Sequence, residues 1–130
     1  MPSVLFVCVA NSCRSQMAEA AVRMLAQPGW EAWSAGSHPG GRVHPVAIEA
    51  MRELRYDLTT HHSKGLADVP QRTWDVVVTM GCGDSCPTVP ATRRLDWAIP
   101  DPVGMPPEGV RAVRDDLIRR VTALVRPGPA

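Results

Sequence analysis

One short stretch near the start of the chain constrains its fold most: an apolar run, a cysteine, five further residues and an arginine. Residues 4–7, Val-Leu-Phe-Val, have the pattern of a buried strand. Apolar side chains then recur at helical spacing from Met17 to Leu25. Cys8 is therefore expected where a strand ends, and Arg14 where a helix begins.

A turn of this kind has a defined chemistry. The first amide groups of a helix have no partner inside the helix, and together with the turn amides they form a cradle for a tetrahedral oxyanion. Arg14 adds a planar fork of donors, and the same positive field favours the nucleophilic thiolate of Cys8. The alternative is a buried cysteine beside an unrelated surface arginine. The expected oxyanion-binding residues are Val9, Ala10, Asn11, Ser12, Cys13, Arg14 and Ser15.

Two side chains, Asn11 and Ser15, are expected to hold the shape of this turn. Asn11 belongs to a residue type that tolerates a left-handed backbone. The Ser15 hydroxyl can donate a hydrogen bond to the Cys8 thiolate and so favour its charged form. Asn11 or Ser15 can instead cap the helix. Cys13 is expected to be structural, or a site of unwanted oxidation, rather than catalytic.

The sequence of residues 8–19 resembles the phosphate loop of the low-molecular-weight protein tyrosine phosphatase superfamily; it reads Cys-Val-Ala-Asn-Ser-Cys-Arg-Ser-Gln-Met-Ala-Glu. Within that superfamily it is most similar to the arsenate reductase branch. The second half of the chain bears on the choice between the two branches.

Strand and helix patterns alternate along the chain, which predicts an α/β fold with a parallel sheet. We expect a three-layer sandwich in which helices flank a central four-stranded parallel sheet, as in the low-molecular-weight phosphatases. The chain reads as one domain, 1–130, with a frayed tail at 127–130. Strands are expected at 1–7, 30–35, 74–80 and 93–98, helices at 15–26, 44–55 and 107–126, and a helical turn at 64–68.

Ligands of parallel sheets bind beyond the carboxyl ends of the strands. Cys8 follows the first expected strand, Cys82 the third and Asp101 the fourth. The fold therefore predicts that these three side chains meet at one edge of the sheet.

Net charge and apolar run length exclude several classes of partner. The net charge of +1 gives no footprint for nucleic acid or a membrane surface, and the longest apolar runs are too short to cross a bilayer. The sequence has no basic-then-apolar leader, which predicts a cytoplasmic protein. We expect a monomer. Four cysteines in such a chain suggest metal binding or redox catalysis rather than a disulfide framework.

Cys82 and Cys86 lie in a glycine-bracketed loop and are separated by three residues. A dithiol beside an oxyanion-binding thiolate suggests a relay in which one thiol attacks the next. The alternatives are two ordinary loop cysteines, or a metal site formed by all four cysteines. Cys8 and Cys13 have a marginal ligand spacing, and Arg14 is an unusual neighbour for a cation, so we expect no metal and no cofactor.

The segment 78–90, which contains both loop cysteines, is similar to the redox loop of thiol-linked arsenate reductases. The resemblance implies reduction of arsenate to arsenite through a Cys8 adduct, followed by Cys8–Cys82 and Cys82–Cys86 disulfides. It also implies thioredoxin as the reductant, ahead of glutaredoxin or mycothiol, and phosphate or sulfate as competing oxyanions. Two other functions stay open: a phosphatase whose extra cysteines protect Cys8, and a non-enzymatic thiol or metalloid sensor.

Asp101-Pro102 matches the general acid loop of the same family. A protonated carboxyl group makes loss of a hydroxide leaving group feasible; the alternative is an ordinary Asp-Pro turn. The phosphatase branch has tyrosines just after this pair, whereas Val103 and Gly104 follow here. A small inorganic substrate therefore fits better than phosphotyrosine.

Glu19, Ser34 and Lys64 form a further expected group. Some arsenate reductases of the family bind potassium through residues aligned with Asn11, Glu19, Ser34 and an acidic residue, and Lys64 occupies the acidic position. We predict that its ammonium group replaces the cation and pairs with Glu19, so that potassium is not required. The alternative is a solvated surface lysine. The four histidines show no ligand spacing and are given no role.

Overall fold

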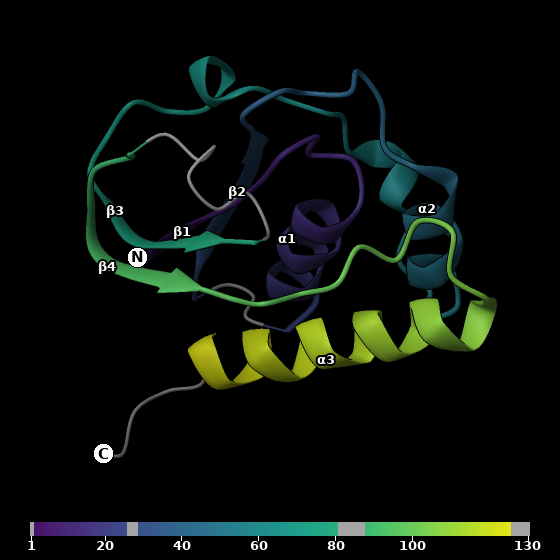
Figure 1. Cartoon of the computed structure of the whole chain (residues 1–130). Helices are drawn as coiled ribbons and strands as arrows, with labels where there is room; N and C mark the ends of the chain where they lie inside the picture. The colour runs from purple at the N-terminus through teal and green to yellow at the C-terminus, as the bar shows by residue number, and fades with distance from the viewer. Residues whose placement is uncertain (1, 26–28, 81–87, 126–130) are drawn as a thin grey trace.

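The computed structural model describes residues 2–25, 29–80 and 88–125. Its sheet has four parallel strands in the order β2-β1-β3-β4, as the sequence predicts (Figure 1). The strands are β1 (Ser3–Cys8), β2 (Glu31–Gly36), β3 (Trp74–Thr79) and β4 (Ala91–Asp96). The helices are α1 (Arg14–Leu25), α2 (Pro45–Arg52) and α3 (Pro107–Val125), with the short 3₁₀ helices η1 (Leu58–Thr60) and η2 (Leu66–Asp68).

The two faces of the sheet are covered differently. Every residue of β1 is buried, as expected of a central strand in a parallel sheet. Val4 and Phe6 point into the larger core, which α1, α2 and α3 complete, whereas Leu5 and Val7 point into a smaller core on the opposite face. In the described part of the chain that smaller core is closed by η2 and neighbouring loops.

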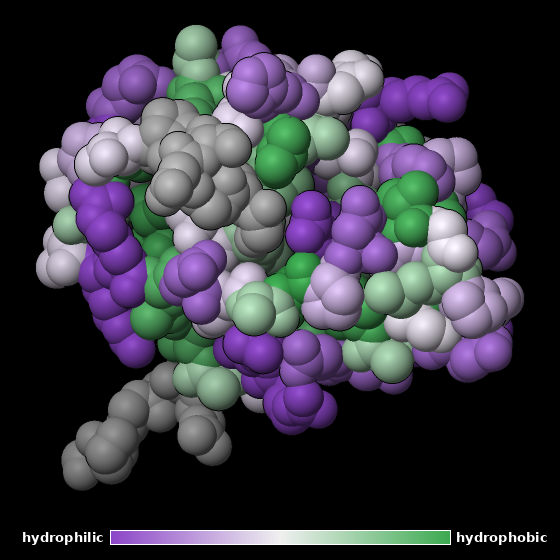
Figure 2. Space-filling view, in the orientation of Figure 1, coloured by the Kyte–Doolittle hydropathy of each residue, from purple (hydrophilic) through white to green (hydrophobic). Residues whose placement is uncertain are grey.

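The edge strand β4 is the most exposed strand of the sheet. Four of its six side chains are exposed, and Arg93 and Arg94 are among them. Figure 2 shows hydrophilic residues along this side of the molecule. Charged side chains on an edge strand oppose pairing with other chains.

Every predicted element lies within two residues of its observed bounds except the second helix, and the fourth strand is displaced by two residues at both ends for an identifiable reason. The second helix ends at Arg52, not at 55, because Arg55 adopts a left-handed conformation (φ 64°) and the Tyr56 amide donates back to Met51. The fourth strand was expected at 93–98 and lies at Ala91–Asp96. Trp97 and Ile99 continue its apolar alternation, but they pack into the core beyond the end of the strand.

No helix in the described ranges is both long enough and apolar enough to cross a membrane. The predicted tail at 127–130 lies outside the described residues.

Candidate active site

The loop between β1 and α1 begins at the carboxyl end of a central strand. Cys8 is the last residue of β1, and Arg14 is the first residue of α1. Arg14 Nη1 donates to the carbonyl oxygen of Ile99 at 3.0 Å, two residues before Asp101. The structure therefore brings the Cys8 loop and the Asp101 segment to the same edge of the sheet, as predicted. Cys82 and Cys86 lie outside the described residues.

The carbonyl groups of this loop are held from outside by the segment 37–44. Amides of that segment donate to four carbonyl oxygens at 2.8–3.2 Å: Ser37 to Cys8, His38 to Val9, Gly40 to Ala10 and His44 to Ser12. The amides from 9 to 16 donate no hydrogen bond to any of the described residues. With its carbonyls engaged and its amides free of protein acceptors there, the loop has the polarity of an anion cradle.

Gly36, at the end of β2, allows this close approach. A Cβ atom at this position would lie 2.5 Å from the Val9 carbonyl oxygen and 2.9 Å from the Asn11 amide nitrogen. A side chain of any size would therefore displace the loop backbone, which explains why glycine stands here.

The sulfur of Cys8 is buried and hydrogen-bonded. Cys8 is only 2% exposed, and its Sγ lies 2.9 Å from Ser15 Oγ. Asn11 Nδ2 donates to the same Ser15 Oγ at 2.8 Å. Asn11 has φ 49°, which confirms the predicted left-handed conformation. Both predicted supporting side chains therefore contact each other and extend to the sulfur.

Cys13 is a different kind of thiol. Burial raises its pKa to about 12, with smaller contributions from the negative charges of Asp101 and Cys8. It therefore stays protonated over the physiological range, which fits the structural role predicted for it.

Asp101 lies on the surface near this loop. Its side chain is exposed, and Oδ1 accepts a hydrogen bond from the Val103 amide at 3.0 Å. The buried Pro102 anchors the segment. An exposed carboxyl group can exchange protons with solvent, and the contact of Arg14 with Ile99 keeps the Asp101 segment beside the Cys8 loop.

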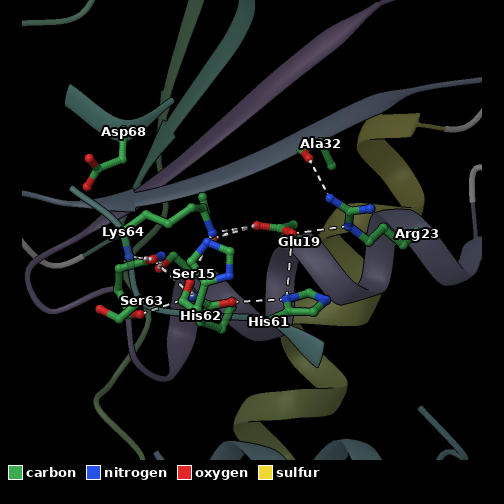
Figure 3. A network of polar contacts seen from close by, with 12 residues as sticks. Ser15, Glu19, Arg23, Ala32, His61, His62, Ser63, Lys64 and Asp68 are labelled. Carbon is green, nitrogen blue, oxygen red and sulfur yellow. Dashed lines mark hydrogen bonds and ion pairs between the residues drawn. The ribbon is translucent and has the colours of Figure 1, made fainter. Parts of the chain in front are cut away.

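Glu19, Ser34 and Lys64 form the predicted cluster, and it is buried (Figure 3). Ser34 Oγ donates to Glu19 Oε1 at 2.6 Å, and Lys64 Nζ lies 3.6 Å from the same oxygen. Lys64 is only 7% exposed, so it is not a solvated surface lysine. Arg23, whose side chain is partly exposed, contacts the other carboxylate oxygen of Glu19: its Nε lies 3.1 Å from Glu19 Oε2.

Within residues 2–25, 29–80 and 88–125, no three His, Cys, Asp or Glu side chains are grouped so as to hold a metal ion. Two members of the alternative four-cysteine metal site lie outside these ranges, so that alternative stays untested.

The structure also places side chains at the site that the sequence reasoning missed. Ser63 Oγ donates to the Ala10 carbonyl oxygen at 3.0 Å. Gln16 and His61, which received no role, form a buried pair beside Asn11. No local pattern identifies them, because Gln16 and His61 are 45 residues apart in the sequence.

Comparison with known proteins gives consistent results. The profile of the low molecular weight phosphotyrosine protein phosphatase family matches residues 3–127. An arsenate reductase of Staphylococcus aureus (strain Newman) is 36% identical over 119 residues, which is 88% of this chain and 89% of the relative. Arsenate reductase 2 of Staphylococcus saprophyticus is 37% identical over 123 residues, or 92% of each chain.

Solved structures give the same picture. An arsenate reductase in its phosphate-binding state superposes with a TM-score of 0.86 at 35% identity, covering 96% of this chain and 97% of the other. A thioredoxin-dependent arsenate reductase of Corynebacterium glutamicum has a TM-score of 0.79 at 35% identity, and the match covers 95% of this chain and 60% of that protein.

Proposed function

Since the chain belongs to the low molecular weight phosphotyrosine protein phosphatase family, we propose that it uses the Cys8 loop to reduce arsenate to arsenite. The observation that carries this proposal is the buried Cys8 sulfur, 2.9 Å from the Ser15 hydroxyl. It lies at the start of a loop whose carbonyls are engaged from outside and whose amides donate to no described residue. The arsenate reductases among its relatives support arsenate as the oxyanion.

In the first step the cradle and Arg14 bind arsenate, and the Cys8 thiolate attacks the arsenic atom. A sulfur–arsenic bond forms while an arsenic–oxygen bond breaks. Asp101 donates a proton to the departing hydroxide, which leaves as water. The contact from Arg14 to the Ile99 carbonyl supports this role for Asp101, because it joins the anion-binding and acid segments.

The second step transfers electrons from thiols to arsenic. The Cys82 thiolate attacks the Cys8 sulfur, a disulfide forms, and the electron pair of the sulfur–arsenic bond leaves with arsenic, which departs as arsenite. Cys86 then attacks Cys82 and releases Cys8, and an external dithiol reduces the Cys82–Cys86 disulfide. Thioredoxin is the proposed donor, supported by the thioredoxin-dependent relative.

The family description keeps a phosphatase as the second candidate. The residues after Asp101 argue against an aryl substrate, because Pro102 is buried and the exposed residues that follow, Val103 and Gly104, carry no aromatic ring for stacking. A phosphatase would hydrolyse an aryl phosphate steadily without any reductant.

The decisive experiment follows NADPH consumption with arsenate, thioredoxin and thioredoxin reductase, beside a Cys82→Ser control. Arsenate-dependent consumption that is absent in the control supports the relay and its donor together. Consumption only with a low-molecular-weight thiol and glutaredoxin or mycoredoxin retains the reductase and changes the donor. Cleavage of an aryl phosphate with no arsenate reduction under any donor replaces the proposal with the phosphatase.

A further inference from the structure

A chain of buried hydrogen bonds runs from the Cys8 sulfur away from the substrate side. It passes from Ser15 through Asn11 to Gln16, whose Nε2 lies 2.9 Å from Asn11 Oδ1. From Gln16 Oε1 it continues to His61 Nδ1 at 3.0 Å. Ser15, Asn11 and Gln16 are all fully buried.

The series of hydrogen bonds that starts at Cys8 ends at a tyrosine hydroxyl. His61 Nε2 lies 2.6 Å from the hydroxyl of Tyr56, and the side chain of His61 is only 7% exposed. Figure 3 shows His61 directed toward Glu19. His61 Nδ1 lies 3.5 Å from Glu19 Oε2.

A backbone group fixes the orientation of Asn11. The Lys64 amide donates to Asn11 Oδ1 at 2.8 Å, and a backbone N–H can only donate. Oδ1 must therefore face Lys64, so Nδ2 is the atom that donates to Ser15 Oγ. The Ser15 oxygen then accepts from Asn11, and its single hydrogen is directed to the remaining partner, Cys8 Sγ.

Gln16 is oriented in the same sense. Its Nε2 faces three oxygens at 2.9–3.1 Å: the Asn11 side-chain oxygen, the Asn11 carbonyl oxygen and the His62 carbonyl oxygen. Its Oε1 can only accept, so His61 Nδ1 must carry a hydrogen. In neutral His61 the Nε2 atom then accepts from the Tyr56 hydroxyl. Burial lowers the pKa of His61, although the nearby Glu19 opposes this effect, and so the neutral form is favoured.

We propose that Gln16 and His61 are positioning residues that act with the Lys64 amide: they hold Asn11 in the orientation that makes Ser15 donate to the Cys8 sulfur. His61 holds the Gln16 amide with its nitrogen toward Asn11. Gln16 donates to both the carbonyl oxygen and the side-chain oxygen of Asn11, and so holds Asn11 in its left-handed backbone conformation. A donated hydrogen bond stabilises the thiolate over the thiol. This role rests on Cys8 being the nucleophile of the proposed function.

The test measures the reactivity of Cys8 rather than arsenate turnover. The rate of alkylation by iodoacetamide at pH 7 follows the thiolate fraction, and tandem mass spectrometry of the tryptic peptide 1–14 separates Cys8 from Cys13. Gln16→Glu keeps the shape of the side chain but replaces Nε2 with an oxygen. This oxygen has no hydrogen to donate to the three oxygens that Nε2 faces. We expect Cys8 alkylation at pH 7 to fall about tenfold, since loss of a hydrogen bond to a charged group changes an equilibrium constant by roughly tenfold or more.

A second position keeps the proposal testable if Gln16→Glu does not fold. His61→Phe retains a ring against Tyr56, with which His61 makes an edge contact at 5.5 Å, but removes both nitrogens. We expect alkylation of Cys8 to fall about threefold. His61→Asn, whose amide nitrogen replaces Nδ1, should restore most of the rate. His62→Phe makes the matched change on the adjacent, exposed side chain and keeps the His62 carbonyl that accepts from Gln16, so it should leave the rate unchanged.

Two results would overturn the proposal: wild-type alkylation in a folded Gln16→Glu protein, or equal effects of His61→Phe and His62→Phe. Because no arsenate is used, failure of the proposed reductase activity does not alter this measurement. Conversely, loss of the expected alkylation differences leaves arsenate reduction as a separate question.

Discussion

Replacing Lys64 with Met is expected to lower the free energy of unfolding by about 2–3 kcal/mol. The substitution keeps the length of the side chain and removes the ammonium group 3.6 Å from Glu19 Oε1. At an effective dielectric constant of about 20, a charge pair at this distance has a Coulomb energy of roughly 5 kcal/mol. Glu19 keeps its bonds to Ser34 and Arg23, so only about half of this energy is expected to be lost.

Urea unfolding monitored by circular dichroism measures this loss, and thermal unfolding should show a decrease of roughly 10 °C in Tm. Arg23→Met is the matched control, because it removes another cation from the same carboxylate. The side chain of Arg23 is 46% exposed, so its loss should cost at most about 1 kcal/mol. If the ammonium group replaces a bound cation, potassium chloride should stabilise the wild-type protein no more than sodium chloride does. Equal destabilisation by the two variants, or a potassium-specific gain in the wild type, would refute the reasoning.

Three other changes test separate parts of the structure. Gly36→Ala should destabilise the protein by about 1–3 kcal/mol in urea unfolding and raise the KM for arsenate, because its Cβ would displace the loop backbone at Val9; an unchanged KM would contradict this role. Asp101→Asn should lower kcat about 10²- to 10⁴-fold while the folded structure is kept, as steady-state kinetics can measure. Glu53 accepts from Arg111 and Arg114, and these hydrogen bonds lower its pKa from 4.5 to about 2. The unfolded state therefore binds more protons, so the contribution of Glu53 is present above pH 4.5 and is lost as pH falls toward 2. Urea midpoints of Glu53→Gln should vary less with pH across this window than those of the wild type.

The strand, loop and helix around Cys8 could be predicted because their signals are local. The apolar run that forms β1 is short and continuous, and the periodicity of α1 starts soon after Arg14. Asn11 could be assigned its left-handed backbone from residue type alone, and the structure has φ 49° there. The pairing of Lys64 with Glu19 came from family alignment rather than from any local pattern.

Other features depend on contacts that a linear pattern does not record. The support of the loop by the segment 37–44 is made by backbone amides, which every residue except proline carries. The Gln16–His61 pair joins polar residues of α1 and the η1 connection that only the folded chain brings together. The fourth strand was predicted two residues too far along the chain, because burial of Trp97 and Ile99 continues after β4 has ended.

The carbonyls of the Cys8 loop are fixed by another stretch of backbone, and this has a consequence for selectivity. A cradle made of main-chain amides responds to the shape and charge of a tetrahedral anion but makes no contact that identifies its central atom. Phosphate, which is abundant in cells, should therefore occupy the same loop as arsenate. In the proposed reaction the two ions would be distinguished after binding, because thiols can draw an oxygen from pentavalent arsenic and leave phosphorus unreduced. The protein would then recognise its substrate by reducibility rather than by fit.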